Sequence, residues 1–114
     1  MNNVFVPLRV KLYPYEAILL KNFLLRIDLE VCELKGKAYN GSIVLSEWFH
    51  KYYMQRSIAI SNGSTKIAKR IDVPLSVARY LLDEMTQRTI PIDLNIILGQ
   101  IHRDLLNRNF LPES

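Results

Sequence analysis

The sequence predicts one mainly α-helical domain of four or five helices, preceded by a short N-terminal strand. Apolar residues recur at helical spacing through most of the chain, and glycine or asparagine separates these segments. Residues 8–12, near the start, alternate apolar and basic side chains as a strand does. The length of 114 residues suits a single domain, 1–114, and leaves no room for a second independent core.

The N-terminal strand is expected at LRVKL, residues 8–12, because apolar and basic side chains alternate there. Pro7 has no amide proton to donate, so this segment should be an edge strand or the start of a strand. A lone strand cannot satisfy its own backbone. It must therefore pair with another segment of the chain or with a second copy.

A long helix is expected over residues 15–35, with Pro14 in its first turn and Gly36 as its stop signal. On a helical wheel it carries two apolar stripes on nearly opposite sides. The first stripe contains Leu20, Phe23, Leu24, Ile27, Val31 and Leu34, and the second contains Ile18, Leu25, Leu29 and Cys32. Such a helix is buried on two sides, within the domain or between subunits. Residues 25–31 also alternate perfectly, so a strand pairing with residues 8–12 remains an alternative for residues 26–34, although we favour the helix.

Further helices follow after the loop KGKAYNGS. Ser46 is expected to cap a helix over residues 47–60, and Ser64 or Thr65 to cap the next one. Pro91 breaks the pattern after residue 85, and Asp93 should cap the last helix. The apolar residues of that last helix are Leu94, Ile97, Leu98, Ile101 and Leu105.

Composition argues against several classes of function. The net charge of +4 is spread along the chain, at +1, +2, +2 and −1 over residues 1–36, 37–65, 66–88 and 89–114, without a concentrated basic run. One cysteine, Cys32, rules out an internal disulfide and a cysteine-rich zinc site, and its burial as a small apolar residue is expected. We expect no membrane span and no secretion signal, which favours the cytoplasm or a virus-like particle assembled there.

No pattern typical of an enzyme is present. His50 and His102 lack partners at the spacing of a metal site or a catalytic dyad, and the four glycines form no phosphate loop. We therefore expect no catalytic residues, no cofactor, no metal and no small-molecule substrate. The aromatic and basic stretch WFHKYYMQR, residues 48–56, could hold single-stranded nucleic acid, but its spacing favours a core stripe.

Residues 66–85 are predicted to form a pair of helices. Apolar positions at Ile67, Ala68 and Ile71, then Ala78, Leu82 and Met85, resemble the generic helix-turn-helix of DNA-binding regulators. The resemblance covers residues 67–85, and it departs from the usual pattern at Asp72, Pro74, Asp83 and Glu84. It implies a DNA-binding or regulatory module that acts on double-stranded DNA as a homo-oligomer.

The same resemblance assigns candidate contacts to DNA. The residues that it would place near phosphates are Lys66, Lys69, Arg70 and Arg88, and those that would probe base edges are Ser76, Arg79 and Tyr80. The alternative is a structural or adaptor subunit of a multiprotein assembly, which would bind partners through its apolar helix faces and edge strand. Regulation requires Lys69 and Arg79 to be exposed on the same side with no apolar neighbours, whereas assembly requires one or both apolar stripes, or the edge strand, to lie open.

Overall fold

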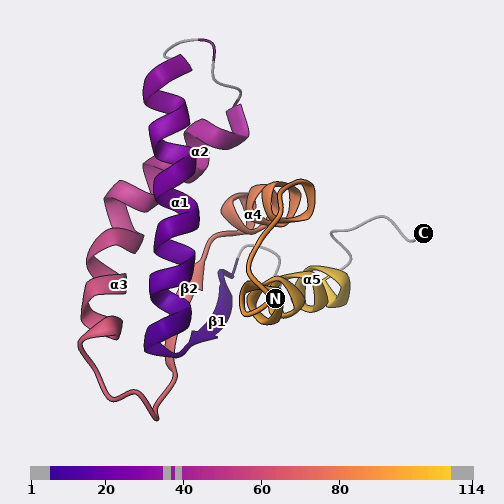
Figure 1. Cartoon of the computed structure of the whole chain (residues 1–114). Coiled ribbons are helices and arrows are strands. Elements are labelled where there is room, and N and C mark those ends of the chain that lie inside the picture. The colour runs from indigo at the N-terminus through magenta and orange to yellow at the C-terminus, as the bar shows by residue number, and fades with distance from the viewer. Residues whose placement is uncertain (1–5, 35–36, 38–39, 109–114) are drawn as a thin grey trace.

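The computed structural model describes residues 6–34, 37 and 40–108, and within them the fold is mainly helical as predicted (Figure 1). The long helix α1 stands beside α3, while a two-stranded ribbon lies between α1 and α5. The elements are β1 (Leu8–Leu12), α1 (Pro14–Leu34), α2 (Asn40–Trp48), the π-helical turn η2 (Phe49–Tyr53), α3 (Met54–Ser61), β2 (Lys69–Val73), α4 (Leu75–Gln87) and α5 (Leu94–Asn107).

The predicted pair of helices over residues 66–85 is wrong in its first half. Residues 69–73 form strand β2, whereas the second helix exists as α4. The β-branched side chains of Ile71 and Val73 are buried while Arg70 and Asp72 are exposed, which is the two-residue period of a strand. Pro74 adds to this preference because proline drives the preceding residue away from helical backbone angles.

Strand β2 is the partner that β1 was expected to need. The two strands pair antiparallel, with Leu8 opposite Val73 and Leu12 opposite Lys69. The side chains that the ribbon directs into the core are Leu8, Val10, Leu12, Ile71 and Val73. The prediction that β1 is a strand is therefore confirmed, and its partner lies within the same chain.

Helix α1 runs from Pro14 to Leu34, so the helix is confirmed for residues 26–34 and the alternative strand is wrong. The expected stop at Gly36 lies outside the described residues. Of the two apolar stripes, the first is buried at Leu20, Leu24 and Ile27. The second is exposed along its whole length, at Ile18, Leu25, Leu29 and Cys32, so the expected burial of Cys32 is wrong.

The helix expected over residues 47–60 begins earlier, at Asn40, and continues through η2 into α3. Ser46 consequently lies inside a helix, where its hydroxyl donates to Asp28 instead of capping an N-terminus. The core interpretation of WFHKYYMQR is confirmed for Trp48, Phe49 and Tyr53, which are all buried. The Tyr53 hydroxyl donates to the Ala17 carbonyl at 2.8 Å, and burial raises the pKa of this phenol.

Candidate nucleic-acid interface

The outer face of the β1–β2 ribbon carries basic side chains. The pleat that buries the apolar residues turns Arg9 and Lys11 of β1 and Arg70 of β2 outward, and all three are exposed. In the antiparallel register Lys11 lies directly opposite Arg70, while Arg9 lies opposite Asp72. We call the three outward cations, together with Arg56 and Arg103 on the neighbouring helices, the basic face.

The pairing of Lys11 with Arg70 is unfavourable for the fold by itself, since like charges directly opposite each other in a sheet repel. The salt bridges among the described residues involve His50, Lys51, Arg88 and Arg108 as cations, and none involves the basic face. Asp72 also lies on this outer face, opposite Arg9, but the five cations outnumber it, so the face keeps an excess of positive charge, which is the chemistry of an anion-binding surface.

Side chains from both neighbouring helices fix the ribbon in place. On the β1 side, the Gln100 amide accepts from the Lys11 backbone N–H and donates to its C=O, each at 3.1 Å. On the β2 side, Arg56 Nη2 donates to the Arg70 carbonyl at 2.9 Å, and the Tyr52 hydroxyl accepts the Asp72 N–H at 3.0 Å. Both strand edges are covered at these positions, so the expected open edge at β1 is occupied by α5.

A shallow groove lies on each side of the ribbon. The first is lined by Lys11, Tyr52, Arg56, Ala68, Arg70 and Asp72. The second shares Lys11 and Ala68, and its other lining residues are Tyr13, Tyr15, Glu16, Asn95, Ile96, Gly99, Gln100 and Arg103. The rings of Tyr13 and Tyr15 stack with centroids 6.4 Å apart, and both side chains are about half exposed. Basic groups beside exposed aromatic rings are typical of surfaces that hold nucleic acid.

The structure separates the residues that the sequence grouped as one site. Arg70 belongs to the basic face, whereas Lys69 follows the pleat of the buried residues and is exposed because it begins the strand. Lys66 is exposed in the segment before β2. Ser76 and Arg79 are exposed on α4, but Tyr80 is half-buried and packs against the core.

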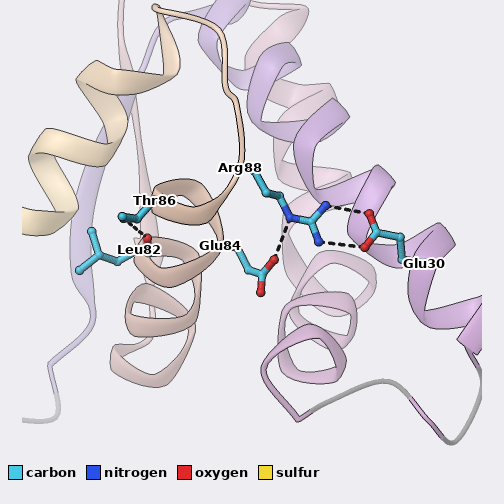
Figure 2. A network of polar contacts seen from close by, with 5 residues as sticks. All are labelled: Glu30, Leu82, Glu84, Thr86 and Arg88. Atoms are coloured by element: carbon cyan, nitrogen blue, oxygen red, sulfur yellow. Dashed lines mark hydrogen bonds and ion pairs between the residues drawn. The ribbon is translucent and has the colours of Figure 1, made fainter.

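Arg88 is partly buried and is bound between α4 and α1 (Figure 2). Its two Nη atoms bind both carboxylate oxygens of Glu30 at 2.7 and 2.8 Å, and its Nε donates to Glu84 at 2.8 Å. Glu84 is buried, so the guanidinium is the group that compensates its charge. The hydrogen bonds from Arg88 lower the pKa of Glu30, and the carboxylates raise the pKa of Arg88. Arg88 thus joins α4 to α1 and is poorly placed to contact phosphate.

A second polar cluster joins α1 to α2 and η2. The Ser46 hydroxyl and His50 Nε2 both contact Oδ1 of the buried Asp28, the imidazole at 2.9 Å. His50 therefore has a partner that its sequence neighbourhood did not reveal. Because the serine donates to the carboxylate, its hydroxyl is not activated by the imidazole as a nucleophile would be. Within the described ranges no three His, Cys, Asp or Glu residues come together as a metal site would require.

Sequence reasoning missed Arg9, Lys11, Arg56 and Arg103 as members of one surface. The sequence did indicate Arg9 and Lys11, because they are the outward residues of a half-buried strand. Such a strand forms a basic face when the strand that pairs with it also carries an outward basic residue. Arg56 and Arg103 come from helices that only the tertiary structure brings to the ribbon.

Comparison with known proteins identifies no relative: no protein-family model, no curated protein and no solved structure matches the chain. None of the helices in the described part of the chain is both long and apolar enough to cross a membrane.

Proposed function

We propose that this protein is a non-enzymatic nucleic-acid-binding module and that the basic face is its contact surface for the phosphate backbone. The observation that carries the proposal is the pair of Lys11 and Arg70, which face each other across the ribbon and form no salt bridge with any described residue. The repulsion between the two cations destabilises the free protein slightly, and a polyanion bound between them would replace this repulsion with attraction.

The covered edges of the ribbon determine how DNA would be approached. A free two-stranded ribbon can enter the major groove of duplex DNA. Here Gln100 on one side and Tyr52 and Arg56 on the other tie both strands to helices. The ribbon therefore lies against the backbone of double-stranded DNA as a surface, and contacts from Arg9, Lys11 and Arg70 to phosphate carry no sequence information.

Helix α4 supplies a separate candidate contact. Ser76 and Arg79 are exposed on it and remain our proposed contacts to base edges, while Lys66 and Lys69 extend the phosphate contacts. We leave Tyr80 and Arg88 out of the interface because one packs on the core and the other is bound to Glu30 and Glu84.

The experiment is a titration of labelled random-sequence duplex DNA followed by fluorescence anisotropy at several salt concentrations. The double variant Lys11→Gln/Arg70→Gln should bind more weakly, and its slope of log affinity against log salt should be smaller by about 2. The control is Lys37→Gln/Lys51→Gln, which removes the same net charge from exposed positions elsewhere and should leave the slope nearly unchanged. Equal losses in the two variants would argue for diffuse charge attraction and against this surface.

A second candidate function is supported by a different observation. The apolar stripe Ile18, Leu25, Leu29 and Cys32 is exposed on α1, as a subunit of a multiprotein assembly requires. In that case the mass of the purified protein in solution would exceed that of one chain even without nucleic acid. Sedimentation at several concentrations tests this second function, and a mass of one chain at every concentration would contradict it.

A further inference from the structure

The exposed side of α1 has the pattern of a helix that packs against another helix. Ile18, Asn22, Leu25, Leu29 and Cys32 follow one another at intervals of four and three residues, which is the spacing of a coiled-coil seam. Ile18 is 46% exposed, Leu25 38% and Leu29 56%, although these side chains are apolar. We call these five residues the α1 seam.

The rest of the described chain leaves this seam uncovered. Helix α1 packs against α2, η2, α3, α5 and β1 through its other sides, whereas all five residues of the seam are exposed. A shallow groove runs along the seam and is lined by Asn22, Leu25, Arg26, Leu29, Glu30 and Glu33. A single polar residue such as Asn22 within an apolar seam is the device that fixes the register of paired helices.

The charges beside the seam indicate which partner fits. Lys21 and Arg26 flank its N-terminal half on opposite sides, and Glu33 flanks its C-terminal half on the same side as Arg26, whereas Glu30 is already paired with Arg88. A second copy of α1 in the same direction would place like charges side by side. An antiparallel copy would instead bring Arg26 of each helix to the flank that carries Glu33 of the other.

We propose that the protein forms a two-fold symmetric homodimer through the α1 seam, with the two helices antiparallel and Leu25 of one copy packed on Leu29 of the other. The symmetry makes one surface patch sufficient for both subunits, as in most homodimers. This register also places Asn22 level with Cys32 of the second copy. The inference rests on the second candidate function, because it names the partner of the same apolar stripe, and it does not depend on nucleic-acid binding, which is assigned to a different face of the molecule.

The surface is tested by measuring mass in solution with a reducing agent present. Sedimentation of the wild-type protein should give a dimer that dissociates on dilution, and Leu29→Lys should give a monomer. Ile96→Lys is the matched control, because Ile96 is an apolar residue on α5 with nearly the same exposure, 55% against 56%. Circular dichroism of both variants verifies that they are folded. A monomeric wild type at all concentrations, or a dimer that resists Leu29→Lys, would overturn the proposal.

The orientation is tested by oxidation. In the antiparallel dimer Cys32 is level with Asn22 of the second copy, and Cys32 of that copy lies ten residues further along the helix. The two Cys32 residues are therefore separated by about 15 Å along the axis. The wild type should therefore not form a covalent dimer, and neither should Asn22→Cys/Cys32→Ser. The variant Asn22→Cys that keeps Cys32 should form a covalent dimer, since the new cysteine at position 22 of each copy is level with Cys32 of the other. Covalent dimers of the wild type would indicate parallel helices and would contradict the proposed arrangement.

Discussion

Lys11 and Arg70 face each other across the β1–β2 ladder, both exposed, and the described part of the chain supplies no carboxylate that forms a salt bridge with either. The backbone on both sides of this pair is nevertheless fixed, by Gln100 at Lys11 and by Arg56 at Arg70. The ribbon thus holds two repelling cations at a defined position. That combination is what links its structure to the proposed binding of phosphate.

Removing one of the two cations should not destabilise the fold. For Lys11→Gln we expect the free energy of unfolding in urea to stay equal or to rise by about 0.5 kcal/mol or less, because the repulsion is relieved. Lys51→Gln should instead lower it by a few tenths of a kcal/mol, roughly, because Lys51 pairs with Glu47 one helical turn away, at 3.5 Å. A loss above about 1 kcal/mol for Lys11→Gln would mean that this lysine stabilises the native fold.

Arg88 should matter for stability far more than the other arginine of the same region. Arg88→Ala leaves the carboxylate of Glu84 buried without its cation, and we expect it to cost about 3 kcal/mol in urea unfolding. Arg79→Ala, on the exposed side of α4, should change stability by about 0.5 kcal/mol or less. Similar losses for the two variants would show that the Arg88 network is not an important link between α4 and α1.

Glu30 should make stability depend on acid pH. The Arg88 hydrogen bonds lower the pKa of Glu30 below the ordinary value of 4.5, so the unfolded chain binds its proton first as pH falls. The contribution of the ion pair is complete above about pH 4.5 and is lost as pH falls through the lower pKa of the folded state. The wild type should therefore lose more stability than Glu30→Gln when the pH is lowered from about 6 to about 3, as measured by thermal unfolding. An unchanged difference would contradict the assigned pair.

Gln100 should control the protection of the β1 edge. Gln100→Ala removes both hydrogen bonds to the Lys11 backbone, and we expect a loss of about 1 kcal/mol together with faster amide hydrogen exchange at Lys11. Asn95→Ala, an exposed substitution earlier on α5, provides the control and should leave that amide unchanged. Equal exchange at Lys11 in the two variants would show that the side-chain amide does not hold this edge.

The fold class was predictable because local signals and tertiary packing agree in α1 and α5. Pro14 and Asp93 mark the starts of the two helices correctly, although the Asp93 side chain forms no cap hydrogen bond. Both apolar stripes of α1 were visible in the sequence. The sequence did not show that one stripe is buried and the other exposed, because only the packing of α2, α3 and the ribbon decides which stripe is buried.

Strand β2 was missed because helix and strand periods overlap in a short segment. Ile67, Ala68 and Ile71 fit one face of a helix, whereas Ile71 and Val73 fit one face of a strand. Pairing with β1 favours the strand, since each strand satisfies the backbone of the other. The same pairing creates the basic face, which is why counting charges along the chain did not find it.

The measurement that tests the central claim most directly is the salt dependence of duplex DNA binding by the wild type and by Lys11→Gln/Arg70→Gln. We expect the wild type to bind at low salt with an affinity that falls steeply as salt rises, and the double variant to lose about 2 from that slope. An undetectable wild-type affinity at low salt, or identical slopes for the two proteins, would contradict the assignment of the ribbon as a phosphate-binding surface.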